Sequence, residues 1–273
     1  MFAGRNWQPT RIARVIQVLN TSTRPLHVVT DDGPALVKYM GNRAGYDALI
    51  GELVGGELAN LIGLRTPDFA IANVSQMELP DPLDIVEPGP AFFSRWEEAT
   101  ALAPHSQLLA NLRHPEQIAW LVVFDTWLRN MDRFADPDEG GDGNENFDNV
   151  LLKADKRKVQ LLVIDHTHAL AETTLDDELG PGWIDEKIVY GRFDQFIPFL
   201  NRRDVRKALK AISDIDRGCV QRICEGVPRE WGMTQGLAER LSACIVERAS
   251  KLATWLPEAL FDQFEMKFES EED

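Results

Sequence analysis

Two charged residues near the start of the chain fall within apolar patterns. Lys38 lies in the apolar stretch 35–40, where the two-residue period of a strand places it on the same face as Leu36 and Met40. Glu52 lies in a pattern of helical period with apolar neighbours. An ion pair between Lys38 and Glu52, across a sheet–helix interface, would make the burial of both charges tolerable. The alternative is two unrelated surface charges, with Lys38 protecting a strand edge or reaching out to water.

The helical pattern that carries Glu52 also contains two consecutive glycines. Gly55 and Gly56 each lower helix stability by roughly 1 kcal/mol relative to alanine. Because glycine has no side chain, another segment can approach a helix closely at such a position. The two glycines therefore predict close packing against this helix.

A second set of polar residues stands at the ends of predicted apolar elements. Asp132 follows a strongly apolar helix, Asn149 directly precedes a strand, and Asp165 directly follows another strand. Oxygen ligands from two such positions, together with waters and phosphates, are what octahedral Mg²⁺ prefers. A third acidic residue could then orient a nucleophile. Each residue alone is explained as well by a helix end or a turn, but the conjunction with Lys38 and Glu52 favours a phosphoryl-transfer site.

Hydrophobic periodicity predicts the elements that would position these residues. The strands are predicted over 15–19, 26–30, 35–40, 69–74, 90–96, 150–153 and 159–164, and the helices over 44–62, 115–130, 202–212, 217–224 and 237–256. The proline-rich segment 79–90 is predicted to be a loop. The change from β-rich to α-rich sequence near 97–103 predicts a boundary between two lobes.

The chain order of these parts is lysine, helix glutamate, aspartate, asparagine before a strand and aspartate after a strand, as in a bilobal kinase. On these residues the sequence resembles the HipA-like kinases, which share the broader fold of phosphoinositide and protein kinases. The likeness is carried by Leu36-Val-Lys-Tyr-Met40, Gly51-Glu-Leu-Val-Gly-Gly-Glu-Leu-Ala59 leading to Gly63-Leu-Arg-Thr-Pro67, Asn130-Met-Asp-Arg133, Asn146-Phe-Asp-Asn-Val-Leu-Leu152 and Val163-Ile-Asp-His166. These segments span residues 36–166.

The resemblance implies an α+β, bilobal protein-kinase-like fold with a small β-rich N-terminal lobe and a larger, mostly helical C-terminal lobe. We expect an ATP-binding lobe over 1–97 and a catalytic lobe over 98–273, with an acidic insertion at 136–148 and an acidic tail at 258–273. The implied activity is ATP- and Mg²⁺-dependent transfer of the γ-phosphoryl group to a hydroxyl, with a protein serine or threonine as the expected acceptor. A lipid or small-molecule hydroxyl stays open as the acceptor.

The resemblance also implies a role for each residue of the series. Lys38 would hold the α- and β-phosphates of ATP and pair with Glu52. Asp132 would accept the proton of the substrate hydroxyl. Asn149 and Asp165 would ligate Mg²⁺.

Two further parts of an ATP site are expected from their place in the chain and not from a motif. Ser94, Arg95 and Trp96 stand where the adenine hinge is expected. The turn 20–25 stands where a loop would cover the phosphates, although it has no glycine to let backbone N–H groups approach a phosphate.

The sixteen residues between Asp132 and Asn149 are more than such kinases usually have there, so an insertion rich in glycine and acids must loop out. Asn144 and Asn146 are therefore alternatives for the metal-binding asparagine. If the insertion misplaces Asn149, the chain is a pseudokinase, a nucleotide-binding module or scaffold without catalysis.

Other metal sites fit the sequence less well. The insertion 136–148 resembles a calcium-binding loop in composition, but it lacks the glutamate expected at the twelfth position. A metal-dependent hydrolase could use Asp132, Asp165 and His168, which are too few ligands to specify a transition metal.

The helix predicted over 202–212 carries a basic stripe. Arg203, Arg206, Lys207 and Lys210 share one face at helical spacing. A solvated face is the default interpretation, and a surface for an acidic substrate or partner is the functional one.

Asp125 is the acidic residue of an otherwise apolar helical pattern. We expect it to be buried and to bond the backbone of the loop that carries Asp132. An exposed position is the alternative.

The composition excludes several classes of protein. The chain has 273 residues, of which 44% are hydrophobic and 27% charged, with a net charge of −15. Such a chain can build a sizeable core, which excludes a disordered or fibrous protein. Its acidity argues against a dedicated DNA-binding protein. The segment 136–148 holds six acidic residues and no basic one, and 258–273 holds seven acidic residues and one lysine, so most of the excess charge lies in one loop and one tail.

Nothing in the sequence indicates a membrane or an oxidising compartment. No apolar run approaches the roughly 18 residues of a membrane span, and the first residues lack a signal-peptide core. Cys219, Cys224 and Cys244 are odd in number and have no Cys-x-x-Cys spacing. We therefore expect a cytoplasmic protein with reduced cysteines and no membrane partner.

Overall fold

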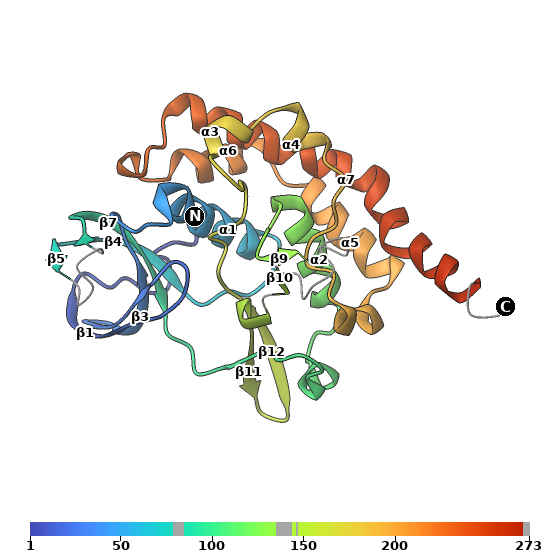
Figure 1. Cartoon of the computed structure of the whole chain (residues 1–273), viewed down its shortest axis with the longest axis horizontal. Helices are drawn as coiled ribbons and strands as arrows, with labels where there is room; N and C mark the ends of the chain where they lie inside the picture. The colour runs from blue at the N-terminus through green and yellow to red at the C-terminus, as the bar shows by residue number, and fades with distance from the viewer. Residues whose placement is uncertain (79–84, 135–143, 146, 270–273) are drawn as a thin grey trace.

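The computed structural model describes the chain apart from residues 79–84, 135–143, 146 and 270–273. A small part built on an antiparallel sheet lies beside a larger, mostly helical part (Figure 1). This arrangement confirms the predicted α+β fold with a β-rich N-terminal lobe and a helical C-terminal lobe. The division between residues 97 and 98 stays a prediction.

The N-terminal sheet has five antiparallel strands in the order β1-β2-β3-β7-β4. The strands are β1 (Ile12–Val18), β2 (Leu26–Thr30), β3 (Gly33–Lys38), β4 (Phe69–Val74) and β7 (Gly89–Arg95). Each corresponds to a predicted strand, and the predictions for β2 and β4 are correct at both ends. The helix α1 (Gly45–Leu61) connects β3 to β4 and lies between the sheet and the helical part (Figure 1).

Alternation along β3 decides which side chains face the space between the lobes. Ala35 and Val37 are fully buried in the core on one face of the sheet. Leu36 and Lys38 point to the other face, where they line a cavity. The strand period thus places Lys38 and Leu36 on one face, as predicted from the sequence.

The segment 79–90, predicted as a loop, contains strand residues at its C-terminal end. The strand β6 (Ile85–Val86) pairs with β5 (Met77–Glu78), and β7 begins at Gly89. The loop prediction was therefore wrong for these residues, while 79–84 lie outside the described residues. Val86 is fully buried, so its packing outweighs the turn-forming composition around it.

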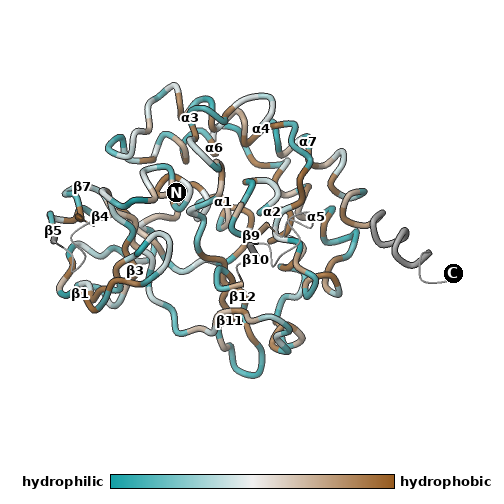
Figure 2. The backbone as a smooth tube through the Cα atoms, viewed as in Figure 1, coloured by the Kyte–Doolittle hydropathy of each residue, from teal (hydrophilic) through white to brown (hydrophobic). Residues whose placement is uncertain are grey.

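The larger part is organised around α2 (Gln117–Leu128), in which every residue from Leu121 to Leu128 is buried. The helices α5 (Arg202–Ser213) and α7 (Gln235–Glu269) pack against it directly, and α6 (Arg217–Glu225) packs against α7 and α1. Apolar segments gather on the inner sides of these helices (Figure 2). All four helices were predicted, although α7 extends beyond the predicted range at both ends.

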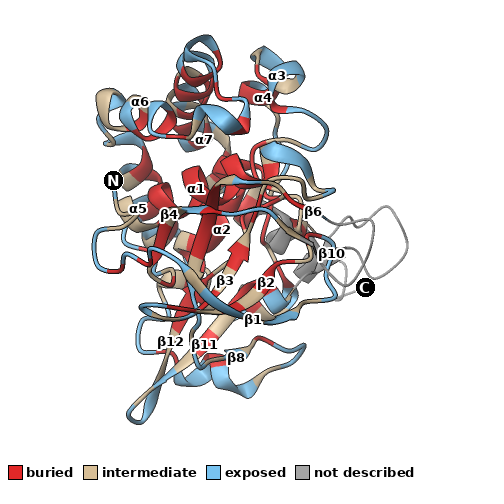
Figure 3. Cartoon of the chain, turned by 90° about the vertical axis from the view of Figure 1, so that its left-hand side faces the viewer, coloured by how far each residue is buried: buried red, intermediate tan, exposed pale blue. Residues whose placement is uncertain are grey.

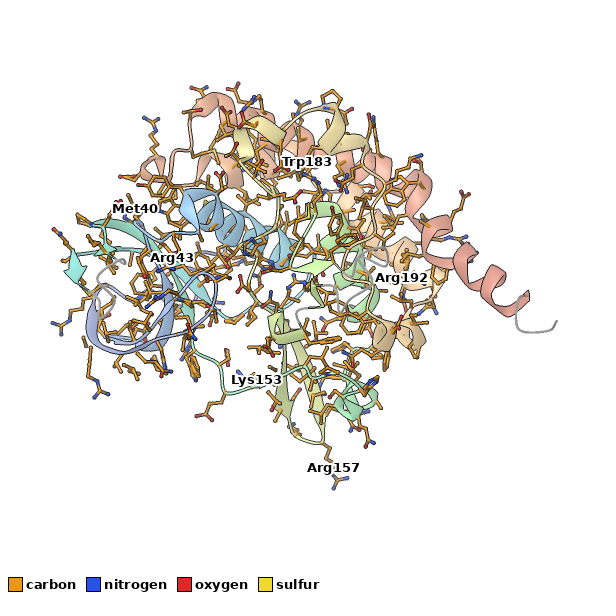
Figure 4. The ribbon with its side chains drawn as sticks, in the orientation of Figure 1. Met40, Arg43, Lys153, Arg157, Trp183 and Arg192 are labelled. Carbon is orange, nitrogen blue, oxygen red and sulfur yellow. The ribbon has the colours of Figure 1, made fainter. Side chains whose placement is uncertain are left out.

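A β-hairpin extends from the helical part and lies at the bottom of the view in Figure 1. It consists of β11 (Val150–Asp155) and β12 (Lys158–Val163), and β8 (Thr100–Ala101) adds a third strand in the order β12-β11-β8. Arg157 lies at the tip of the hairpin and points into solvent (Figure 4). The base of the hairpin carries Asn149 and Asp165, so the two residues are brought together by one pair of strands.

Several short elements were not predicted. Besides β5, β6 and β8, they are β9 (Arg133–Phe134), β10 (Asn144–Glu145), α3 (Leu175–Glu178), α4 (Pro181–Asp185) and the 3₁₀ turns η1 (Gln107–Asn111), η2 (Phe147–Asn149), η3 (Asp194–Phe199) and η4 (Arg229–Trp231). They are too short for a hydrophobic period to be recognised. Within the described residues, no helix combines the length and the apolar character needed to span a membrane.

The helix α1 is enclosed on all sides. Every residue from Ala48 to Ala59 is buried, including two glutamates, and Figure 3 shows α1 and α2 together in the interior. Its apolar residues share one core with those of α2. The helix that carries Glu52 is therefore held by both parts of the molecule.

Candidate functional site

A cavity of about 320 Å³ lies between the N-terminal sheet and the base of the β11–β12 hairpin. The predicted site residues that line it are Lys38, Glu52, Ser94, Arg95, Trp96, Asn149 and Asp165. Leu36, Val163 and Leu151 add apolar surface from both sides. The structure thus brings together side chains that lie up to 127 positions apart in the sequence.

The ammonium group of Lys38 is the centre of a four-residue contact. It forms an ion pair with Glu52 and donates hydrogen bonds to Asp165 Oδ1 at 2.8 Å and to Thr167 Oγ1 at 2.6 Å. Thr167 Oγ1 in turn donates to Glu52 Oε1 at 2.8 Å, and the backbone N–H of His166 donates to the same oxygen at 3.2 Å. The ion pair between Lys38 and Glu52 that the sequence predicted is therefore present, and it extends to the segment after β12.

Burial and charge shift the pKa values of this cluster in opposite directions. Burial opposes the charge of Lys38, but the carboxylates of Asp165 and Glu52 outweigh it and raise the pKa of the lysine. Burial raises the pKa of Glu52 to about 7 against the opposing effect of Lys38. Burial also acts on Asp165, but there Lys38 and Thr167 outweigh it and lower the pKa of the carboxyl. Asp165 is thus the carboxylate of the cluster that is held in its charged form.

Glycines on α1 allow the segment 165–169 to approach the helix. A Cβ added at Gly51 would lie 2.5 Å from the carbonyl oxygen of His166, and one added at Gly55 would lie 2.6 Å from His166 Cβ. A Cβ at Gly56 would lie 3.2 Å from the ring of Phe69. The predicted close packing at Gly55 and Gly56 is confirmed, and it positions Glu52 against the backbone after Asp165.

Asp165 adopts a left-handed backbone conformation two residues after the end of β12, with φ of 59°. Aspartate tolerates this region better than most residues. The turn is closed by a hydrogen bond from the backbone N–H of Thr167 to Asp165 Oδ1 at 3.3 Å. This local conformation turns the carboxylate back toward Lys38 and the cavity.

Asp132 lies beside this group and touches Asn149. The amide Nδ2 of Asn149 donates to Asp132 Oδ2 at 3.3 Å. The Nε2 atom of His168 lies 3.8 Å from Asp132 Oδ1. Burial raises the pKa of Asp132, with the charge of His168 opposing that shift. Asn149 and Asp165 therefore line the cavity, and Asp132 is joined to them through its hydrogen bond with Asn149.

The expected role of Asp125 needs a correction. It is fully buried, as expected, but within the described part of the chain its carboxylate bonds side chains and not the backbone of the loop after α2. It accepts two hydrogen bonds from the guanidinium of Arg133, both at 2.8 Å, and one from Asn130 Nδ2 at 3.4 Å. A buried carboxylate is better compensated by a cation than by neutral donors, which accounts for the difference. The sequence signal for Arg133 was the acidic residue Asp125 within an apolar helical pattern, because a buried carboxylate needs a positively charged partner.

The hinge candidates Ser94, Arg95 and Trp96 also line the cavity. Ser94 pairs with Leu36 in the sheet, and Trp96 stacks on His27 with ring centroids 4.1 Å apart. Thr21 and Pro25 bring the turn 20–25 to the cavity wall. These placements agree with an adenine hinge and a covering turn, whose functional roles stay predictions.

The basic stripe on α5 is not part of the cavity. Arg203, Arg206, Lys207 and Lys210 are all exposed. Lys207 pairs with Asp204 at 3.0 Å and Lys210 with Asp214 at 2.6 Å, so half of the stripe is neutralised by its own helix. The acidic partner proposed for this face stays a prediction without support from the structure.

Three sets of residues carry side chains that could bind a metal ion. Most of the proposed calcium loop, and Asn146, lie outside the described residues, while Asn144 lies in β10. Among the residues that the structure describes, no three histidine, cysteine or acidic side chains are grouped so that they could hold a metal by themselves, so the hydrolase alternative gains no ligand set. Asn149 and Asp165 do fit Mg²⁺, because this ion commonly uses one or two protein oxygens and completes its octahedron with phosphates and waters.

Comparisons with known proteins agree with this geometry. A family model described as HipA-like kinase matches residues 12–258. Among solved structures, a similar one is the crystal structure of the Helicobacter pylori proinflammatory kinase CtkA, with 14% sequence identity and a TM-score of 0.60. The alignment covers 93% of this chain and 96% of the other, and at this identity it shows the fold alone. No curated protein sequence matches.

Proposed function

The chain belongs to the HipA-like kinase family, and on that premise we propose that it binds ATP with Mg²⁺ and phosphorylates a serine or threonine of a protein. The observation that best supports this function is the contact of Lys38 with Glu52, Asp165 and Thr167 at the cavity wall. It joins the sheet, α1 and the segment after β12 around one cation. Such a cation is suited to phosphate oxygens, and the adjacent carboxylate to a metal ion.

The site must first bind and orient the nucleotide. In this proposal residues 1–97 form the ATP-binding lobe, and the wall at 94–96 receives the adenine. Lys38 holds the α- and β-phosphates, and Glu52 fixes the direction of the lysine side chain. Asn149 and Asp165 would hold Mg²⁺, which neutralises charge on the phosphates when it is bound.

The second task is to remove the proton of the acceptor hydroxyl. The hydroxyl oxygen attacks the γ-phosphorus, the bond to the β,γ-bridging oxygen breaks, and ADP leaves. Asp132 takes the hydroxyl proton on Oδ1, because Oδ2 already accepts a hydrogen bond from Asn149. Burial raises the pKa of Asp132, which brings it nearer to the operating pH of a general base.

The test is a comparison of binding and turnover in three proteins and one control. Wild type, Asp132→Ala and Asp165→Ala are measured by thermal shift with ATP at varied Mg²⁺, and by phosphate transfer from γ-labelled ATP. Asp214→Ala is the matched control, because Asp214 is exposed on the far end of α5. We expect Asp132→Ala to bind ATP but to lose about 10²–10⁴-fold in transfer, and Asp165→Ala to lose the Mg²⁺-dependent shift.

Each of the other outcomes has a definite meaning. Nucleotide binding without turnover in wild type would identify a pseudokinase, and label appearing in lipid or in a small molecule would change the acceptor class. No binding of ATP would reject the proposal as a whole. Full turnover in Asp132→Ala and Asp165→Ala would reject the roles assigned to these residues.

A further inference from the structure

Arg133 is a fully buried arginine directly after Asp132. Its Nε and one terminal nitrogen donate to the two oxygens of Asp125, each at 2.8 Å, in a bidentate ion pair. Neither side chain is exposed to solvent. This pair fixes the guanidinium to α2, the most deeply buried helix of the C-terminal part.

The remaining terminal nitrogen of Arg133 reaches the base of the hairpin. It donates to the carbonyl oxygen of Ile164 at 3.0 Å and to that of Asn149 at 3.3 Å. The carbonyl of Asn149 also accepts from the backbone N–H of Ile164 at 3.2 Å. One nitrogen therefore holds the peptide of Asn149 and the peptide that directly precedes Asp165.

We propose that Arg133 is a positioning residue that sets the separation of the oxygens of Asn149 and Asp165 and thereby the affinity of the site for Mg²⁺. This inference rests on the proposed function, in which these two residues are the metal ligands. Mg²⁺ requires nearly ideal octahedral geometry, so a small shift of either peptide lowers its affinity. Groups that orient metal ligands commonly contribute 10–100-fold to metal affinity.

The shape of the guanidinium is essential to this role. Its planar fork can face a carboxylate with two nitrogens while the third faces two carbonyl groups. A lysine at this position can keep the charge opposite Asp125 but cannot reach both sides at once. Gly191 limits any adjustment, because its own Cβ position lies 2.5 Å from Asp125 Oδ2, and its N–H donates to the backbone carbonyl of Arg133.

The experiment compares Arg133→Lys with a matched buried arginine. Arg248 is equally buried and donates to backbone carbonyls of Thr126, Trp127, Trp183 and Glu186, none of which belongs to the proposed metal site. Wild type, Arg133→Lys, Arg248→Lys and Asp165→Asn are each titrated with Mg²⁺ in the presence of the non-hydrolysable analogue AMP-PNP. The readouts are the thermal shift and, with Mn²⁺ in place of Mg²⁺, the electron paramagnetic resonance signal of the free ion.

We expect Arg133→Lys to raise the Mg²⁺ concentration at half-maximal shift by at least tenfold. Arg248→Lys should lower the melting temperature but leave that concentration unchanged. A folded Arg133→Lys protein with the metal affinity of wild type would overturn the inference. If Arg133→Lys does not fold, the uncharged pair Asp125→Asn/Arg133→Gln takes its place, with the same expected loss and the same overturning result.

The titration of wild type separates this inference from the proposed function. A metal-dependent shift that is lost in Asp165→Asn but unchanged in Arg133→Lys rejects only the positioning role. No metal-dependent shift in wild type rejects the proposed function, and the role of Arg133 is rejected with it.

Discussion

Gly51 offers a sharp test of how α1 is held against the segment after β12. The substitution Gly51→Ala adds one methyl group at a position where three carbonyl oxygens converge. It would meet His166 O at 2.5 Å and the carbonyl oxygens of Thr167 and Ala169 at 3.3 Å each. These are backbone atoms, so the contact is relieved only if the helix or the segment moves.

Two opposing effects determine the size of the change. Alanine is favoured over glycine within a helix by about 1 kcal/mol. Inserting a methyl group into a well-packed interior costs about 1–3 kcal/mol. We therefore expect the free energy of unfolding to fall by up to about 2 kcal/mol in Gly51→Ala. The shift of α1 should also weaken the bonds from Thr167 and from the His166 N–H to Glu52, and so lower nucleotide affinity.

The measurement is urea-induced unfolding together with an ATP-dependent thermal shift. Gly236→Ala is the matched control, because Gly236 also lies in a helix and no atom of the described residues lies within 4 Å of its Cβ position. This control should be more stable than wild type by up to about 1 kcal/mol, the full value applying to the middle of a helix. Equal stabilisation by Gly51→Ala and Gly236→Ala would refute the close packing inferred at α1.

Three further changes test other parts of the site. Both ring nitrogens of His166 lack a hydrogen-bond partner among the described residues, and burial lowers the pKa of this side chain to about 3. As the pH falls below 6.5, this histidine is therefore protonated in the unfolded chain but stays neutral in the folded protein. Wild type should therefore lose about 2 kcal/mol more stability than His166→Phe between pH 7 and pH 5 in urea unfolding, and equal losses would contradict this. Lys38→Met leaves the carboxylates of Glu52 and Asp165 without their shared cation. We therefore expect about 3 kcal/mol lower stability in urea unfolding and no ATP-dependent thermal shift. A retained thermal shift would count against the phosphate role of Lys38. Trp96→Ala should weaken ATP binding several-fold in calorimetry with little change in stability, because the residue lines the cavity and is 38% exposed. Unchanged binding would reject a hinge at 94–96.

Much of the arrangement around Lys38 could be predicted from the sequence, because strand and helix periods determine which face a residue occupies. The face of Lys38 followed from the alternation of β3, and the close packing of α1 followed from Gly55 and Gly56. The chain order of Asp132, Asn149 and Asp165 then indicated which elements had to converge.

Contacts that do not follow from hydrophobic periodicity were not predicted. Thr167 is an ordinary polar residue in the sequence, and only the turn after Asp165 brings its hydroxyl to Lys38 and Glu52. Asp125 was expected to bond backbone groups, because nothing in its helix indicates that the chain folds Arg133 back onto it. Two-residue strands such as β6 and β8 depend on partners far along the chain, so local sequence carries little information about them.

The enclosure of α1 by both parts of the molecule has a consequence for how the protein unfolds. The amide hydrogens between Ala48 and Ala59 can reach solvent only when the core shared with α2 opens. Their hydrogen exchange therefore reports the free energy of global unfolding and not that of a local fluctuation. Although the structure has two distinguishable parts, we expect them to unfold together as one cooperative unit. The reason is that α1 packs against both parts.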